Sequence, residues 1–346
     1  MRLISRVIPV AVLVAALGSE AAIGQTPAGA TAVLGTGTFT AFVENMDRSL
    51  AFFHDAFGME VPALPATGER PYNRANPQLF TWFDIAGAKE RHQSARVPGT
   101  RVTLEIMEIQ DVPHQTIALR IQDPGNATLV LMVRDLDTTL ARARQANATI
   151  ATPGAKPVAL ADGTRSILIR DIDSRFIELR QPASVPATGD ILDMRLLITV
   201  NDMDETKRAY HDALGFTIEG ETAFAPDAPM RALTGLSAAQ VRRSRAQAPG
   251  SMLWIEFVEF KGVDRKPLRM KIQDRGAARL QLRVQNVDAI VPAMKAGGWR
   301  VFSEGVPIPP NLKGALVADP NNFFLTPYAP CDGCAPGILP TPAPVR

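Results

Sequence analysis

The sequence predicts an α+β fold built from four βαβββ modules, and two levels of repetition in the chain predict it. The first is a tandem duplication: residues 121–133 match residues 272–284 at an offset of 272 − 121 = 151, which also relates Glu105 to Glu256. The second lies inside each copy. Four times, an alternating strand ends in Val and is followed by a turn, an amphipathic helix and three strand-like segments.

The helices are predicted from apolar residues at i, i+3 and i+4 spacing, such as Leu50, Phe53 and Phe57 in the first helix. A turn before each helix supplies side-chain acceptors for its first N–H groups. Segments 171–174 and 319–322 contain residues that favour tight turns and predict hairpins. The expected helices are 46–58, 136–146, 203–215 and 287–298, and the turns before them are 44–45, 134–135, 201–202 and 285–286.

The duplication also divides the chain into domains. We expect a first domain at 36–182 and a second domain at 192–328. The segment between them, 183–191, contains Pro, Ala and Gly and is the expected linker, and a Pro-rich tail follows at 329–346.

Residues 1–24 have the pattern of a secretory signal peptide. Arg2 and Arg6 form a positive start, Val7 to Leu17 is an apolar run too short to span a bilayer, and small residues follow up to Gly24. A retained membrane anchor is the alternative. We expect a secreted or periplasmic mature protein that has no membrane attachment after cleavage.

The composition favours a small molecule as the ligand. The chain has 346 residues, of which 46% are hydrophobic, so it can bury the cores of two domains. A formal net charge of +2 and only three Trp and three Tyr give no electrostatic or stacking surface for nucleic acid. A monomer and a homodimer both remain open.

The only two cysteines, Cys331 and Cys334, form one CxxC motif in the tail. A single motif after the last strand of an exported protein predicts a local structural disulfide. A redox or metal-binding role is the alternative.

Several motifs together resemble the vicinal oxygen chelate superfamily, which contains glyoxalases, bleomycin-resistance proteins and ring-cleaving dioxygenases. They are Val43-Glu-Asn-Met-Asp, Val200-Asn-Asp-Met-Asp and the closing Asp171-Ile-Asp-Ser-Arg-Phe-Ile-Glu-Leu179. The resemblance covers Thr38 to Tyr328. It implies that two modules pair so that their curled sheets enclose one ligand cavity, and we therefore expect one cavity in each copy.

The resemblance also implies where a metal would bind. Metal-using relatives take one ligand from the first strand and one from the last strand of a module, and their sites mix His with Glu or Gln. None of the corresponding residues here is a histidine, so the cofactor is unknown and the ligand set for a divalent metal is incomplete. The first-strand positions are Thr38, Thr128, Arg195 and Arg279, and the last-strand positions are Glu105, Glu178, Glu256 and Thr326.

We expect function in the first copy, in one cavity lined by Thr38, Glu105, Thr128 and Glu178. Its two carboxylates, the catalytic candidates, have no counter-charge in the sequence, and two buried carboxylates repel unless a proton, cation or ligand is shared. A metal held by oxygen atoms, a general base and a hydrogen-bonded polar cavity all remain open. The insertion 70–99, with Phe80, Trp82 and Phe83, is the expected apolar lid.

The second copy is expected to differ, because Arg195 and Arg279 lie on either side of Glu256. Two guanidiniums beside one carboxylate disfavour a divalent cation. The cluster is either a buried structural network or a receptor for an anionic ligand group. Its insertion, 222–250, is a second expected binding loop.

The four histidines lie outside these positions. His54 and His211 are expected on the solvent side of helices, and His92 on the surface in a polar loop. His114 follows the strand of Glu105 and is a candidate at the cavity mouth.

Three functions remain open. The first is metal-independent binding of a small molecule, as in the bleomycin-resistance branch. The second is a lyase, isomerase or dioxygenase with catalysis by Glu105 and Glu178. The third is a scaffold for protein assembly. The absence of histidine at the eight positions favours binding, and the two carboxylates keep the enzyme possible.

Overall fold

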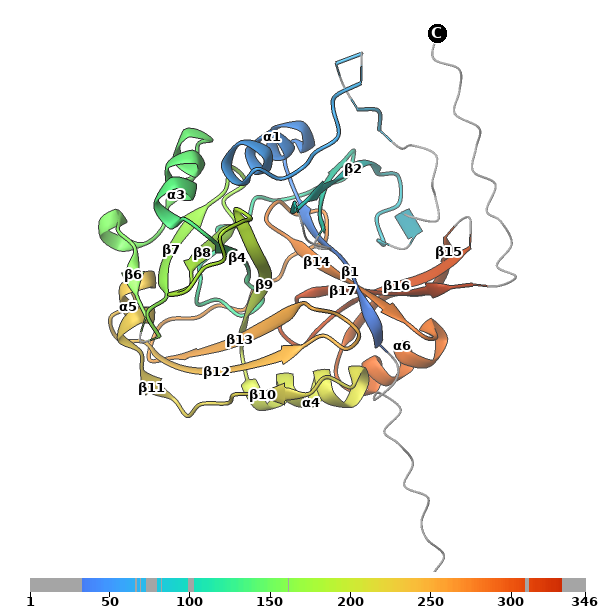
Figure 1. The fold of residues 1–346 in the computed structure, drawn as a ribbon. Coiled ribbons are helices and arrows are strands. Elements are labelled where there is room, and N and C mark those ends of the chain that lie inside the picture. Colours follow the sequence, from blue (N-terminus) through green and yellow to red (C-terminus); the bar gives the residue numbers. More distant parts are fainter. Residues whose placement is uncertain are drawn as a thin grey trace, which may run out of the picture.

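The computed structural model describes residues 33–331 apart from 66, 69, 73–79, 82, 99–102, 161 and 309–310. The described residues form two mixed β-sheets with helices packed on them (Figure 1). The expected α+β class is confirmed, and so is its repeated strand–helix–strands unit.

The four modules follow one another along the chain. Module one contains β1 (Val33–Phe42), α1 (Met46–Phe57), β2 (Lys89–Arg96) and β3 (Thr103–Gln110). Module two contains β4 (Ala127–Val133), α3 (Leu136–Gln145), β5 (Thr149–Ile150), the 3-10 helix Pro153–Ala155, β6 (Val158–Ala159), β7 (Arg165–Arg170) and β8 (Phe176–Gln181). Module three contains β9 (Ile191–Val200), α4 (Met203–Leu214), β10 (Ile218–Glu219), β11 (Ala225–Pro226), α5 (Ala228–Thr234), β12 (Gln240–Gln247) and β13 (Trp254–Lys261). Module four contains β14 (Ala278–Val284), α6 (Val287–Ala296), β15 (Arg300–Ile308), β16 (Leu312–Ala318) and β17 (Phe324–Pro330).

The starts of the helices agree with the sequence prediction. The residue before each of α1, α3, α4 and α6 accepts a hydrogen bond from a backbone N–H of the first turn. These N-cap residues are Asn45, Asp135, Asp202 and Asn286. The duplicated Glu108 and Glu259 add a second acceptor, because they bind the N–H groups that open α1 and α4.

The pairing of the modules differs from the expectation. Strand β1 pairs with β14 and strand β4 pairs with β9, both antiparallel. Modules one and four therefore share a seven-stranded sheet, β15-β16-β17-β14-β1-β3-β2, and modules two and three share a ten-stranded sheet. The prediction that the modules of one copy enclose one cavity is wrong, since each sheet takes one module from each copy.

The helices pack where the two sheets meet. Helix α1 contacts α3, and α4 contacts α6, so each contact joins a helix of one sheet to a helix of the other (Figure 1). One continuous apolar cluster includes residues of both sheets and of these helices, such as Leu104, Phe53, Leu196 and Val291. One face of each sheet is therefore buried against helices, and the alternate residues of its strands point to the opposite face.

Both predicted insertions contain regular structure. Residues 89–96 form β2, an edge strand of the seven-stranded sheet, and residues 240–247 form β12. These strands have few apolar residues, so they lack the alternation of apolar and polar residues that predicts a strand. Their side chains are instead held by ion pairs, such as Arg91 with Glu108.

Some predictions fall outside the described residues. The signal peptide, Trp82, Cys334 and most of the Pro-rich tail belong to this group, and they stay predictions. Cys331, at the end of the described chain, is disulfide-bonded. No helix among the described residues is long and apolar enough to cross a membrane.

Candidate functional site

The centre of the seven-stranded sheet holds a buried ion pair between the two copies. Arg279, from β14, donates to Glu105 Oε2 on β3 over 2.7 Å and to Thr40 Oγ1 on β1 over 2.9 Å. Thr40 in turn donates to Glu105 Oε2 over 2.6 Å. The Arg279 side chain is only 2% exposed. Burial lowers the pKa of Arg279, against the opposing charge of Glu105.

Aromatic rings cover this ion pair. The guanidinium carbon of Arg279 lies 4.8 Å from the ring centre of Phe83 and 5.8 Å from that of Phe42. The two rings meet edge to face. Phe80 and Phe83 belong to the apolar cluster on this face of the sheet. The insertion that carries them thus lies against the Glu105 site, and a cation over aromatic faces is favourable in a desolvated site.

A histidine lies on the neighbouring strand. His92 Nδ1 is 2.8 Å from Glu90 Oε2, and both residues belong to β2, so the prediction that His92 lies in a surface loop is wrong. Glu90 is fully buried, whereas the His92 side chain is 46% exposed. The hydrogen bond to Glu90 raises the pKa of His92 against desolvation, and the charge of Glu105 adds to the increase. His92 therefore lies near Glu105 with one ring nitrogen fixed by a carboxylate.

The centre of the ten-stranded sheet is organised around Arg180. This guanidinium binds both oxygens of Glu178, at 2.7 and 2.9 Å, and reaches Glu256 of the other copy at 2.7 Å. Arg195 is 3.5 Å from the same Glu256 oxygen and pairs with Asp193. Burial alone would raise the pKa of Glu256, but Arg180 and then Arg195 hold it below its ordinary value.

These contacts correct two predictions. Thr38 and Glu105 lie in one sheet and Thr128 and Glu178 in the other, so these four residues do not line one cavity. The two carboxylates also have counter-charges, Arg279 and Arg180.

The predicted Arg195–Glu256–Arg279 cluster is likewise divided between the sheets, because Arg279 binds Glu105. Arg180 takes its place beside Glu256. Arg180 was missed although it follows Glu178 by two residues, the spacing that places two side chains on the same face of a strand.

The two centres differ in how their hydroxyl groups are bonded. In the ten-stranded sheet, Thr128 accepts a hydrogen bond from Asn126. In the seven-stranded sheet, the hydroxyls of Thr38 and Thr326 and Glu90 Oε1 are buried and have no hydrogen-bond partner among the described residues. In the ten-stranded sheet the same holds for Asn126 Oδ1, but for no hydroxyl. Buried polar atoms without a partner are costly and mark sites where water or a ligand binds.

The remaining histidines lie elsewhere. His54 and His211 are on exposed positions of α1 and α4, as expected. His114 is exposed and contacts Arg275, and it lines a small cavity with Gln110 and Asp111. None of Thr38, Glu105, Thr128 and Glu178 lines that cavity, so His114 is not at the predicted place.

Comparisons with known proteins agree with this architecture. The model of the Glyoxalase/Bleomycin resistance protein/Dioxygenase superfamily matches residues 35–171 and 194–325. The chain belongs to this superfamily. No curated protein sequence matches it.

Two solved structures have the same fold. Glyoxalase I from Zea mays is 15% identical, with a TM-score of 0.54, and the match covers 86% of this chain and 92% of that one. A single-residue mutant of the same enzyme is 14% identical, with a TM-score of 0.55, and the match covers 87% of this chain and 94% of that one. At these identities the likeness concerns the fold alone.

The residues at the eight positions where the resemblance predicts metal ligands, called the superfamily positions from here on, do not fit a metal ion. In the seven-stranded sheet they are Thr38, Glu105, Arg279 and Thr326, and in the other sheet Thr128, Glu178, Arg195 and Glu256. Each set contains an arginine, and its carboxylates already bind guanidinium groups. A hydroxyl is a poor ligand for zinc or iron, and a fixed guanidinium repels a divalent cation. The described residues hold no group of three or more His, Cys, Asp or Glu placed for a metal.

Arg180→Met tests whether a guanidinium holds the ten-stranded centre together. We expect the free energy of unfolding to fall by about 3–5 kcal/mol, because Glu178 is left buried without its cation. Adding Glu178→Gln should recover part of the loss. The difference in unfolding free energy between Arg180→Met and the wild type should be smaller at acidic pH, where the carboxylates become neutral. Chemical denaturation of the three proteins measures this, and a loss of less than about 1 kcal/mol would show that the pair behaves like a surface ion pair.

Proposed function

We propose that this protein binds a small polar organic molecule, without a divalent metal, at the centre of the seven-stranded sheet. The difference between the two centres carries the proposal. Every charged or hydroxyl group at the superfamily positions of the ten-stranded sheet has a partner. In the seven-stranded sheet, the hydroxyls of Thr38 and Thr326 are buried and unbonded. A structural network satisfies its polar groups, whereas a binding site keeps some of them for its ligand.

The chemistry of the site limits the ligand. The groups without a hydrogen bond include two hydroxyls, which can donate or accept, and one carboxylate oxygen of Glu90, which only accepts. The ligand therefore supplies at least one N–H or O–H donor. Arg279 balances Glu105, while among the described residues Glu90 pairs only with His92, which is a cation when protonated. The site therefore favours a neutral or positively charged ligand. The rings of Phe42 and Phe83 provide an apolar surface beside the polar groups.

Matched Thr→Val substitutions test the unbonded hydroxyls. Thr38→Val and Thr326→Val should leave the free energy of unfolding unchanged or raise it by up to about 1 kcal/mol, because each removes a buried hydroxyl that has no partner. Thr40→Val should lower it by about 1–3 kcal/mol, because Thr40 bonds to both Glu105 and Arg279. Denaturant titration compares the three variants.

The same variants test binding. A thermal-shift screen with small amines, amides and alcohols should give compounds that stabilise the wild type. Their effect should be lost in Thr38→Val/Thr326→Val and kept in Thr128→Val, the control in the other sheet. The proposal fails if Thr38→Val and Thr326→Val destabilise the protein as much as Thr40→Val, or if the compounds still stabilise the double variant.

One observation favours catalysis as the second candidate. Glu90 fixes Nδ1 of His92, and the partly exposed ring has its other nitrogen available as an acid or base. Glu105 and Glu178 cannot act as a pair, since they lie in different sheets and bind different arginines. An isomerase or lyase reaction by proton transfer would therefore use His92.

Glu90→Gln tests whether Glu90 controls the protonation of His92. In the wild type the pKa of His92 is raised, so its protonated form adds stability below the ordinary pKa of about 6.5. This stability is lost as the pH rises through the higher pKa of the folded protein. In Glu90→Gln we expect a lower His92 pKa and a weaker dependence of stability on pH in this range. Proton NMR titration of the imidazole measures the shift, and equal pKa values in both proteins would contradict the pairing.

A further inference from the structure

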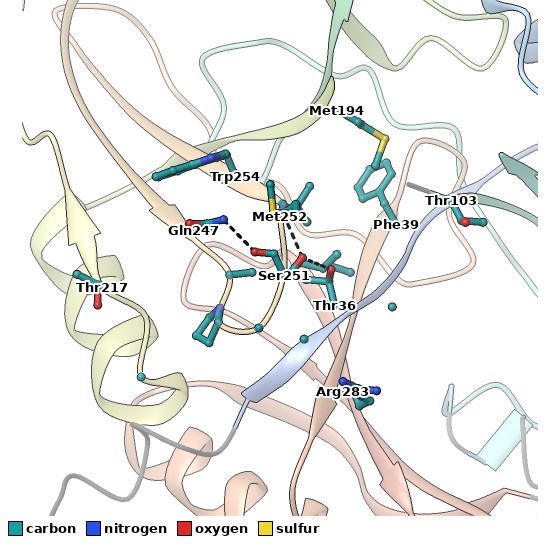
Figure 2. A pocket seen from close by; sticks show the side chains of 18 of the residues that line it. Thr36, Phe39, Thr103, Met194, Thr217, Gln247, Ser251, Met252, Trp254 and Arg283 are labelled. Atoms are coloured by element: carbon teal, nitrogen blue, oxygen red, sulfur yellow. Dashed lines mark hydrogen bonds between the residues drawn. The ribbon is translucent and has the colours of Figure 1, made fainter. Parts of the chain in front are cut away.

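A cavity of about 790 Å³ lies where modules one, three and four meet. It begins next to the seven-stranded centre, since Gly37 and Phe39, on either side of Thr38, both line it. Its walls come from the start of β1, the turn between β12 and β13, and strands β14 and β17 (Figure 2). Neither Glu105 nor Arg279 lines it. Its volume is in the range of cavities that bind small organic molecules.

Close backbone contacts build the walls. Gly250, in the turn between β12 and β13, has φ +64°, and a Cβ there would lie 2.3 Å from the carbonyl oxygen of Leu34. A Cβ on Gly37 would lie 2.7 Å from Gln281 Oε1. Thr36 and Ser251 join the two walls through a hydrogen bond of 2.6 Å between their hydroxyls (Figure 2). Only glycine fits these two approaches, so the walls of the cavity are closely packed against each other here.

One part of the lining is apolar. Phe39 and Met194 lie next to each other at one side of the cavity, and Met252, next to Ser251, also lines it (Figure 2). Met252 is 80% exposed, which is unusual for a large apolar side chain. These three side chains offer a surface that an apolar ring or chain of a ligand can cover.

The other part of the lining offers two hydrogen-bond donors. Arg283 and Tyr328 are register partners on the parallel strands β14 and β17, so their side chains leave the same face side by side. Phe39, which pairs with Leu280, lies on the opposite face, and the cavity passes from one face to the other at Gly35 and Gly37, where there are no side chains. Burial raises the pKa of the Tyr328 phenol, and the charge of Arg283 lowers it by less. The phenol therefore stays protonated at neutral pH and can donate a hydrogen bond. Arg283 donates one hydrogen bond of 3.2 Å, to the carbonyl of Leu34. Among the described residues, no carboxylate lies within ion-pair distance of Arg283.

We propose that this cavity is a second binding site, which takes an amphiphilic organic anion. Arg283 and Tyr328 bind its carboxylate or sulfonate group, because a guanidinium without a carboxylate partner beside a phenol forms charge-assisted hydrogen bonds with such a group. Phe39, Met194 and Met252 cover its apolar part. The negative charge of this ligand distinguishes the proposal from the site at Thr38 and Thr326, which favours a neutral or positively charged ligand.

Fluorescence titration with anilinonaphthalene sulfonate, an anion with an apolar ring system, tests the proposal on the whole protein. We expect saturable binding that octanoate displaces and octanol does not. Arg283→Gln should weaken it by about tenfold or more, since it removes the charge that binds the sulfonate. Arg269→Gln, the control, makes the same charge change at an exposed arginine outside the cavity and should leave the affinity unchanged.

A second variant keeps the test valid if Arg283→Gln alters the fold. Thr217 lines the cavity and is exposed, so Thr217→Trp fills the space without breaking a side-chain hydrogen bond among the described residues. It should also weaken binding. No saturable binding, or binding that neither Arg283→Gln nor Thr217→Trp weakens, would overturn the proposal.

Discussion

The antiparallel pairing of first strands across the two copies determines the rest of this structure. Strand β1 joins β14, and β4 joins β9, so neither copy completes a sheet alone. The same pairing brings opposite charges together. Thr40 faces Arg279 in register, and the arginine then reaches Glu105 on the next strand. In the other sheet, Arg180 of the first copy reaches Glu256 of the second. Each centre is therefore neutralised by charges from both copies.

Guanidinium groups bind the carboxylates at the positions where the resemblance to the superfamily predicts metal ligands. A buried arginine satisfies a carboxylate through fixed, planar donors, and its charge does not depend on the concentration of free metal. At the ten-stranded centre this arrangement leaves no superfamily position without a partner. At the seven-stranded centre it leaves the hydroxyls of Thr38 and Thr326. After duplication, one sheet thus has the features of a structural support, and the other keeps groups that can bind a ligand.

Local features of the fold could be predicted from the sequence. Apolar periodicity and N-cap residues predicted the four helices, and the duplicated segments predicted the two copies. The partners of the modules could not be predicted, because the first strands all alternate in the same way and any two of them could pair. The resemblance identified the eight positions at the centres but assigned them to the wrong cavities for this reason.

Polar strands were the other source of error. Strand β2 has the sequence Lys-Glu-Arg-His-Gln-Ser-Ala-Arg, which has no apolar alternation, so His92 was placed in a loop. The fold tolerates this strand at the edge of a sheet, where Arg91 binds Glu108 and Glu90 binds His92. Spacing at i and i+2 could have revealed Glu90 beside His92, and Arg180 beside Glu178. It could not have revealed the unbonded hydroxyls, which depend on the neighbouring strands.

The most direct test of the account is to produce the two copies separately, as residues 33–186 and 187–346. If the sheets are shared, neither half can be a folded monomer, because each would expose the edges of two first strands. Produced together, the halves should form a one-to-one complex with a cooperative thermal transition. Analytical ultracentrifugation and circular dichroism distinguish the outcomes. A half that is monomeric and unfolds cooperatively on its own would contradict the pairing across copies, and with it the assignment of both centres.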